Sequence, residues 1–263
     1  GGMNEFNASF AANYENKVYF GFGLNVNRVR YSEQNTFAER DNPVTTNNWN
    51  SYNFTRNLET RGAGFGGRIG VIFRPNNNIR VGATIHTPTV LSLTDNYYDE
   101  LYVLNDDKST HDLKTIDKEF SYSVTTPMKY GFQAAYIFEK QGFLSAEIES
   151  IDYSTMSLSA DNNLFSATNQ VIANKYSNTI NLKLGGEYAY ESFRFRAGYA
   201  HMGNPIKNSD AFANNRVSIG MGVQERDWAF DFGVIKTITE DSYVPYKVPG
   251  ASANAVSSNT NGT

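Results

Sequence analysis

Two glutamates, Glu147 and Glu149, have the spacing in this sequence that most resembles a catalytic pair. Residues two positions apart on an extended strand lie on the same face, so the two carboxylates would lie side by side. Paired carboxylates can serve as general acid and base in the hydrolysis of a glycosidic bond. No neighbouring motif would position a sugar beside them, so we expect solvated carboxylates and no catalytic residues.

The three histidines, His86, His111 and His201, are scattered along the chain and form no i, i+4 pair of the kind that suits a metal. The chain contains no cysteine, which excludes disulfides, thiolate ligands and a cysteine nucleophile. Residues 105–107 (NDD) carry calcium-type oxygen ligands, but we interpret them as a solvated loop. No G-x-S-x-G sequence indicates a serine nucleophile. We therefore expect no metal, no cofactor and no enzymatic activity.

Residues 62–67 (GAGFGG) match the G-x-G-x-x-G pattern of dinucleotide-binding proteins. That function requires a helix to begin directly after the glycines, so that its N-terminus faces the pyrophosphate. Here the glycines run into a segment in which apolar residues alternate with small or charged ones. We therefore interpret them as strand glycines that relieve crowding on one face of a sheet.

The elements that position these residues are segments with a period of two, in which apolar side chains alternate with polar or small ones. This pattern predicts strands with one apolar face. Ten such segments span residues 6–14, 18–26, 63–74, 79–86, 120–138, 144–149, 180–190, 193–199, 217–223 and 228–234. The segment 120–138 keeps aromatic and apolar residues on one parity from Phe120 to Phe138, interrupted only by Thr126.

Short and long connections alternate between these segments. Short ones lie near residues 15–17, 75–78, 139–142, 191–192 and 225–227, and long polar ones near 32–60, 94–118, 152–175 and 202–213. Transmembrane β-barrels have short turns on the periplasmic side and long loops outside, with aromatic residues at both interfaces. Aromatic residues lie beside the short connections here, for example Tyr14, Phe73, Tyr136 and Trp228. The alternative is a large soluble all-β domain.

Composition agrees with an antiparallel, up-and-down transmembrane β-barrel. The chain has 263 residues, including 18 Phe and 17 Tyr, and its mean hydropathy is −0.49. No apolar stretch is long enough for a transmembrane helix, whereas a barrel needs only one apolar face on each strand. The net charge of −4 gives no basic surface for nucleic acid. We expect Phe20, Val71, Phe132 and Phe230 to face acyl chains.

The strand positions that alternate with the apolar ones carry the side chains that would line the interior. The candidate lumen-lining residues are Arg68, Arg80, His86, Lys129, Glu147, Glu149, Lys183, Glu187 and Arg196. They could form a polar path or hold a plug through charge pairs. The interpretation that we favour is a water-facing interior whose charges neutralise one another.

The polarity of the ten strands predicts that residues 1–263 are one incomplete barrel domain. The first segment ends at a short connection and the tenth begins after one, so the outer ends of both lie on the long-loop side. Open strand edges in lipid are prohibitive, because their backbone groups have no hydrogen-bonding partner. We expect at least one further strand before Gly1, one after Thr263, and a polar loop or tail at residues 239–263.

Several stretches resemble the FadL/TodX/OMPP1 family of outer-membrane transporters of hydrophobic compounds. They are residues 12–26 (ANYENKVYFGFGLNV), 64–88 (GFGGRIGVIFRPNNNIRVGATIHTP), 193–205 (FRFRAGYAHMGNP) and 216–234. The resemblance implies a 14-stranded barrel, to which three strands upstream and one downstream of the ten would bring this chain. It also implies an N-terminal hatch and a kinked upstream strand, neither of which has a counterpart in these residues.

The resemblance further implies passive uptake of hydrophobic small molecules, such as long-chain fatty acids or aromatic hydrocarbons, across the outer membrane of a Gram-negative bacterium. Its expected partners are membrane lipid, lipopolysaccharide and the hydrophobic ligand. The alternative function is a structural or interaction barrel of a secretion or surface-assembly complex, which would bind other outer-membrane proteins through its long loops. A barrel enzyme such as a lipase is a third, weaker alternative.

Overall fold

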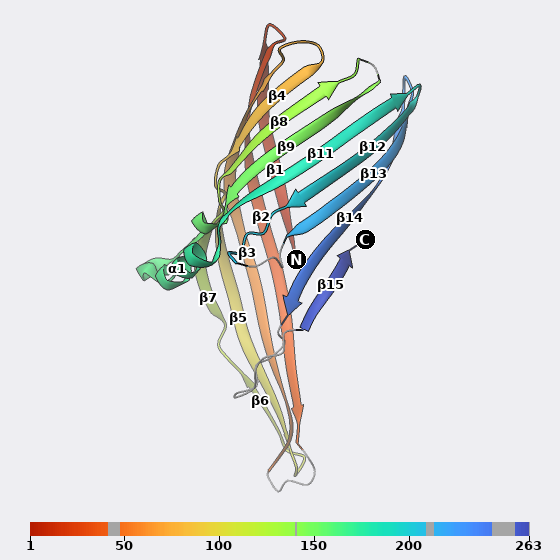
Figure 1. Ribbon diagram of the computed structural model, residues 1–263. Helices are drawn as coiled ribbons and strands as arrows, with labels where there is room; N and C mark the ends of the chain where they lie inside the picture. Colours follow the sequence, from red (N-terminus) through yellow and green to blue (C-terminus); the bar gives the residue numbers. More distant parts are fainter. Residues whose placement is uncertain (42–47, 140, 209–212, 244–255, 263) are drawn as a thin grey trace.

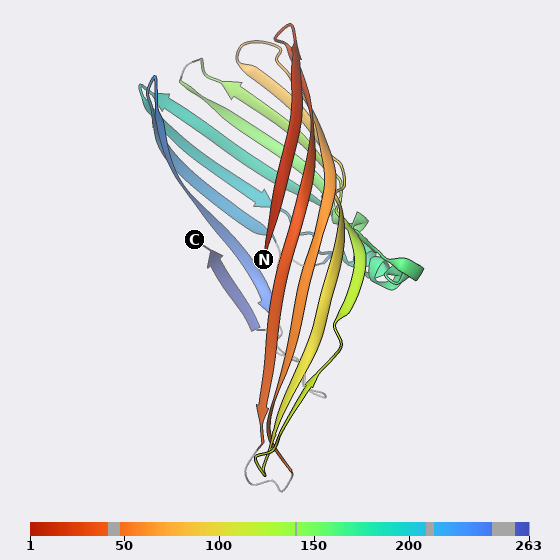
Figure 2. The same cartoon turned by 180° about the vertical axis from the view of Figure 1, so that it is seen from behind.

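The computed structural model describes residues 1–41, 48–139, 141–208, 213–243 and 256–262. They form one antiparallel sheet that curls, so that β1–β3 lie across an open interior from β11–β14 (Figures 1 and 2). The strands are β1 (Gly2–Tyr14), β2 (Val18–Arg40), β3 (Trp49–Phe73), β4 (Ile79–His86), β5 (Val90–Asn105), β6 (Thr110–Lys114), β7 (Lys118–Thr125), β8 (Lys129–Ile137), β9 (Gly142–Asp152), β10 (Ser157–Ser159), β11 (Asn178–Tyr190), β12 (Phe193–Met202), β13 (Asn214–Gln224), β14 (Ala229–Tyr243) and β15 (Val256–Gly262).

Neighbours along the chain are neighbours in the sheet. β4 and β5 lie end to end along β3 and both pair with it, so they form one interrupted strand, which we call a line. β8 and β7 form a second such line, and β9 and β10 form a third. Each of the ten predicted segments lies in one of these lines, which confirms the all-β, up-and-down antiparallel architecture. Among the described residues, β1 pairs only with β2 and β15 only with β14, so the sheet does not close on itself.

Two of the predicted long loops, 32–60 and 94–118, are mostly strand, so that part of the prediction is wrong. β2 and β3 run for 23 and 25 residues, which is roughly 75–80 Å of extended chain. They reach far past the apolar band and pair with each other and with β5. Both faces are wet there, so the apolar alternation disappears while the backbone hydrogen bonds continue.

The other long connections are also more ordered than a loop. Residues 152–175 contain β10, two 3₁₀ turns and helix α1 (Ser166–Lys175). Residues Val256–Gly262, expected in a polar tail, pair with β14 as strand β15. No helix among the described residues has the length and apolar character needed to cross a membrane.

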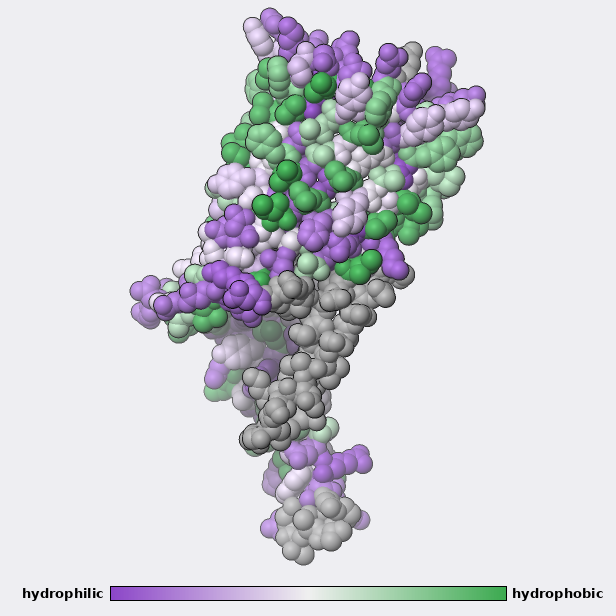
Figure 3. Space-filling model, in the orientation of Figure 1, coloured by the Kyte–Doolittle hydropathy of each residue, from purple (hydrophilic) through white to green (hydrophobic). Residues whose placement is uncertain are grey.

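The apolar face of the sheet is exposed, as the membrane interpretation requires. The exposed fractions are 51% for Phe20, 43% for Val71, 65% for Phe132 and 67% for Phe230. Ile151 is the one apolar residue classed as fully buried among those described. A soluble all-β domain would pack these side chains together in a dry core. In Figure 3 green, hydrophobic residues are scattered among white and purple ones over the upper part of the molecule.

The height of the apolar band matches a bilayer. At the end of the sheet with the short turns, drawn at the top of Figure 1, the band is limited by the register row that contains Tyr14. Its other limit is the row of Phe6, Val26, Phe65 and Val90. The strand residues from one row to the other, 6–14 on β1, number nine. A tilted transmembrane strand takes roughly 9–11 residues to cross the hydrocarbon core.

The segment 120–138 does not keep one lipid-facing side, and this corrects the sequence analysis. The chain leaves the sheet at Pro127, which lacks the N–H that a central strand donates. Beyond this break Tyr130 pairs with Ile85 on the outer face, whereas Val124 pairs with Leu91 on the inner face. A shift of one residue moves every following side chain to the other face. Phe120, Tyr122 and Val124 therefore point inward.

The same reversal occurs in the neighbouring line at Pro88, and threonines close the hydrogen-bond ladder at both breaks. The amide of Gly67 donates to Oγ1 of Thr87 (2.8 Å), and the amide of Thr89 donates to Oγ1 of Thr126 (2.8 Å). The amides of Thr87 and Thr126 still donate to carbonyls of the adjacent lines, at 2.9 and 3.0 Å. The side chains that face inward therefore change from one side of the break to the other, while hydrogen bonds continue between the neighbouring strands.

The two faces can be tested with one pair of adjacent residues on β13. Ile219 is 64% exposed on the apolar face, and Ser218 points inward beside Gly198. We expect Ile219→Lys to lower the free energy of unfolding by about 2–4 kcal/mol, because it places a charge in hydrocarbon. Ser218→Lys should cost less than about 1 kcal/mol. Urea unfolding in phospholipid vesicles measures both, and equal losses would contradict the assignment of faces.

Candidate functional site

Two cations and a histidine between them form a row across the inner face of the sheet. Arg68 on β3 pairs in register with His86 on β4, which pairs with Lys129 on β8. We call these residues the cation row. Nη2 of Arg68 donates to Oδ1 of Asn7 at 3.2 Å. Among the described residues, no carboxylate forms an ion pair with any of the three, so the row has a net positive charge.

The predicted carboxylate pair lies on β9, the strand next to Lys129 of β8, and both carboxylates have partners. Nζ of Lys183 lies 2.8 Å from Oε1 of Glu147 and 3.7 Å from Oε1 of Glu149. The side-chain amide of Asn181 donates to Glu149 at 2.9 Å. Each carboxylate thus has a cation or an amide beside it. The arrangement stabilises charges within the wall and presents neither a free acid nor a free base.

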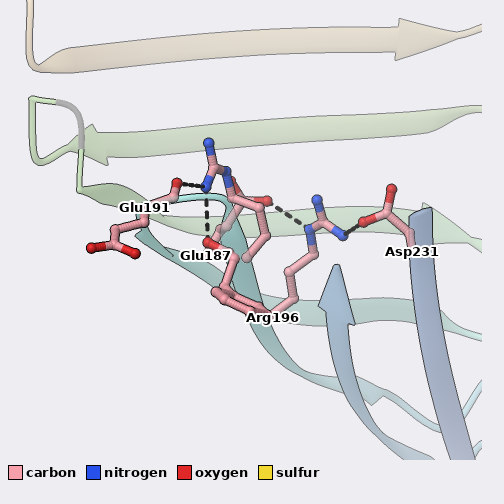
Figure 4. A network of polar contacts seen from close by, with 6 residues as sticks. Glu187, Glu191, Arg196 and Asp231 are labelled. Carbon is pink, nitrogen blue, oxygen red and sulfur yellow. Dashed lines mark hydrogen bonds and ion pairs between the residues drawn. The ribbon is translucent and has the colours of Figure 1, made fainter. Parts of the chain in front are cut away.

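A second ion cluster joins β11, β12 and β14 (Figure 4). Nε of Arg196 lies 2.6 Å from Oε2 of Glu187, and its Nη1 pairs with Asp231. Nε of Arg194 is 3.9 Å from Glu187, and its Nη1 donates to the carbonyl of Glu191 at 2.8 Å. The predicted residues Glu187 and Arg196 are thus brought together. The four charged side chains of this cluster therefore neutralise one another. That they line a water-filled lumen stays a prediction.

Arg80 has a local structural partner. Its Nη1 donates to the carbonyls of Asn76 (3.0 Å) and Ile79 (2.9 Å), so it closes the short turn before β4. Asn76 also accepts from the amides of Asn78 and Ile79, which explains the asparagine run in this turn. Arg80 still borders the inner cavity, but its guanidinium is largely committed to the turn.

A cavity of about 650 Å³ lies on the inner face between β1 and β9. Arg68, His86, Gln133 and Glu147 border it, with glycines of β2, β3 and β4 forming part of its floor. The glycines of residues 62–67 belong to strand β3, and no helix follows them. A Cβ at Gly64 would collide with the side chain of Leu91. These glycines thus make room for inner side chains, as the sequence analysis inferred.

The face reversal creates an apolar surface on the inner wall that the sequence analysis missed. Register partners place Leu91, Leu93, Tyr122, Val124 and Leu158 on the inner face of β5, β7 and β10. We call these five residues, with Phe120 and Phe165, the inner apolar patch. Gly64 pairs with Leu91 four positions along β3 from Arg68, so the patch begins roughly 13 Å from the cation row.

The segment between β10 and β11 completes this patch. The ring of Phe165, just before α1, lies 6.0 Å from the ring of Phe120 and 6.1 Å from that of Tyr122. The side-chain amide of Asn169 donates to and accepts from the backbone of Leu158, both at 2.8 Å, as a neighbouring strand would. The sequence signals for this site were Pro88 and Pro127, each between residues of otherwise regular strands.

The described part of the predicted loop 202–213 folds against the same rim; residues 209–212 lie outside the described residues. The amide of Gly203 donates to Asn181 at 3.1 Å, and Thr179 donates to the carbonyl of Asn204 at 3.2 Å. Ile206 forms a bridge with Tyr176. Asn181 and Thr179 are consequently almost completely buried.

The remaining candidate groups do not form a metal site. His111 lies on β6, and Nδ1 of His201 is 2.9 Å from Oδ1 of Asn215. Asp107 accepts hydrogen bonds from the hydroxyl and amide of Ser109, which lower the pKa of Asp107 and form an ordinary turn. Among the described residues there is no group of three or more His, Asp or Glu that could hold a metal ion.

Comparisons with known proteins give the same architecture. The family model described as outer membrane protein transport protein (OMPP1/FadL/TodX) matches residues 2–242. A Pseudomonas aeruginosa FadL homologue superposes with a TM-score of 0.63 at 14% identity, covering 94% of this chain and 62% of its own. The CymD monoaromatic hydrocarbon channel gives 0.62 at 14%, with 90% and 68% covered. The P. putida toluene transporter TodX gives 0.58 at 13%, with 92% and 64% covered.

No curated protein matches the sequence. The chain spans about two thirds of the length of the solved structures, so it corresponds to part of a barrel of that kind. The family consists of outer-membrane transport proteins, which agrees with the expected absence of enzymatic activity. The exposed apolar band, the alternating connections and the family match over residues 2–242 all indicate one identity. The chain belongs to the OMPP1/FadL/TodX family of transport proteins of the bacterial outer membrane.

Proposed function

We propose that this chain forms the wall of a channel for passive uptake of hydrophobic small molecules. The observation that carries the proposal is the inner apolar patch on a wall that is otherwise lined by charges and glycines. A lumen used only for ions or sugars gains nothing from apolar side chains facing water. Two of the similar structures are a monoaromatic hydrocarbon channel and a toluene transporter, which supports the same ligand class.

The patch and the cation row together favour amphipathic ligands. An apolar body that covers the patch gains about 25 cal/mol for each Å² removed from water. An anionic group roughly 13 Å further along the wall would meet Arg68 and Lys129, which have no carboxylate ion-pair partner among the described residues. Long-chain fatty acids have this arrangement. Aromatic hydrocarbons would use the patch alone.

The alternative of an interaction barrel finds less support. A barrel that serves only to present its long hairpins to another protein has no need for an empty cavity in its interior. The inner face here borders a cavity of about 650 Å³. Binding of other outer-membrane proteins through the extended hairpins stays a prediction.

Removing apolar character from the patch tests its role. We expect Val124→Thr combined with Leu158→Asn to weaken binding of both hexadecanoate and toluene by about 10-fold or more. Each side chain contributes roughly 1–2 kcal/mol when an apolar ligand covers it. Uptake by cells that express the full-length protein, and equilibrium binding in detergent, measure the effect.

The matched control makes the same changes on the lipid-facing side, as Val217→Thr with Leu184→Asn. Those side chains are exposed on β13 and β11 and should leave ligand binding per folded molecule unchanged. Heat-modifiable electrophoretic mobility reports the folded fraction. If the inner and outer pairs affect binding equally, the patch is not the ligand site.

Neutralising the cation row separates the two ligand classes. Arg68→Gln combined with Lys129→Gln should weaken hexadecanoate binding by about 10-fold and leave toluene binding unchanged. A hydrogen bond to a charged group contributes about 1.5–3 kcal/mol, and only the carboxylate can accept it. Arg68→Lys combined with Lys129→Arg should restore most of the affinity. An equal loss for both ligands would contradict a role in binding the anionic group.

A further inference from the structure

Three arginines lie on the outer face of the sheet just past the end of the apolar band. Arg28 and Arg30 follow Val26 at two-residue steps on β2, so they share its lipid-facing side. Arg61 lies beside them on β3, directly opposite Arg30 in the register. All three are exposed. We call them the arginine patch, and it lies on β2 and β3, the front strands of Figure 2.

The charges of the arginine patch are poorly compensated within the chain. Arg30 and Arg61 face each other across the strand pair, an arrangement that destabilises a sheet when nothing neutralises it. Arg61 has one acidic partner, Glu59, with Nε 2.7 Å from Oε1. No described residue forms an ion pair or a side-chain hydrogen bond with the guanidinium of Arg28 or Arg30. The patch therefore keeps two unmatched positive charges.

The neighbouring positions leave the patch open. On one side the register partners are Gly2 and Asn4 of β1, and a Cβ at Gly2 would meet nothing within 4 Å. On the other side they lead to Ser92 and Thr94 of β5, and Thr94 shares a hydrogen bond with Ser121 at 3.0 Å. Hydroxyl groups thus border the guanidinium groups, and no bulky side chain of these neighbours covers them.

The height of the patch relative to the bilayer identifies which anion it meets. Short turns mark the periplasmic end, so the patch lies at the outer-leaflet boundary. Next to it, toward the middle of the bilayer, are the outward side chains of Phe6, Val26, Phe65 and Val90, which mark the edge of the apolar band. A molecule that spans both regions has acyl chains against the apolar band and a negatively charged head group against the arginine patch.

We infer that the arginine patch binds phosphate groups of the outer-leaflet glycolipid, of the lipopolysaccharide type. Guanidinium groups form paired, charge-assisted hydrogen bonds with phosphate oxygens, and three of them can surround one phosphate group. The bound phosphate offsets the repulsion between Arg30 and Arg61. This site is on the outer surface and does not depend on the proposed uptake function.

The test uses the full-length protein, freed of lipid in detergent, and bis-phosphorylated lipid A as the probe. We expect Arg28→Gln combined with Arg30→Gln to raise the Kd for the probe at least 10-fold, measured by native mass spectrometry. Dephosphorylated lipid A should bind the natural protein at least 10-fold more weakly than the phosphorylated form. Raising the salt concentration should weaken binding, because the sites are exposed to solvent.

A control of equal charge change is Lys17→Gln combined with Arg226→Gln, at exposed turns on the periplasmic end. It should leave the Kd unchanged, and both double variants should keep the heat-modifiable mobility of folded protein and the uptake of hexadecanoate. Unchanged lipid A binding by the Arg28/Arg30 variant would overturn the inference. Full competition by inorganic phosphate at equal concentration would also overturn it, by assigning the patch to a free anion.

Discussion

The structure depends on one constraint: inside a bilayer, every backbone N–H and C=O must be paired within the protein, while the side chains that point outward must be apolar. A continuous antiparallel sheet satisfies the first condition and an alternation of period two satisfies the second. The exposed apolar side chains, for example Phe20 with an exposed fraction of 51% and Phe132 with 65%, follow from this constraint. Among the described residues Ile151 is the one fully buried apolar residue, because lipid takes the place of a core.

The same constraint explains how the wall can change its inner chemistry without opening. At Pro88 and Pro127 two adjacent lines lose regular pairing, and the hydroxyls of Thr87 and Thr126 accept the amides that would otherwise have no partner. Each line resumes one residue out of phase, so its apolar side turns inward on the outer-leaflet side. The inner apolar patch and the cation row then lie on one wall, and the proposed uptake function rests on their proximity.

Charges on the two faces serve different purposes. On the inner face Glu187, Arg196 and Asp231 neutralise one another across three strands, so they stabilise the wall. Arg68 and Lys129 have no such acidic partner among the described residues and are available to a ligand. Arg28 and Arg30 lie on the opposite face, at the bilayer boundary, where lipid phosphate is the abundant anion. Position relative to the membrane gives the same residue type separate roles.

The amino-acid sequence by itself determined the strand segments and the outward direction of Phe20, Val71, Phe132 and Phe230, because a period of two is a local property. It did not determine the long hairpins beyond residue 28, since strands that are wet on both faces lose that period while their backbone pairing continues. Nor did it place Tyr122 and Val124 on the inner face: their parity with Tyr130 looks unbroken, and only the pairing across the sheet shows that Pro127 shifts it. Which charges meet, such as Lys183 with Glu147 and Arg196 with Asp231, was decided by register between strands far apart in the chain.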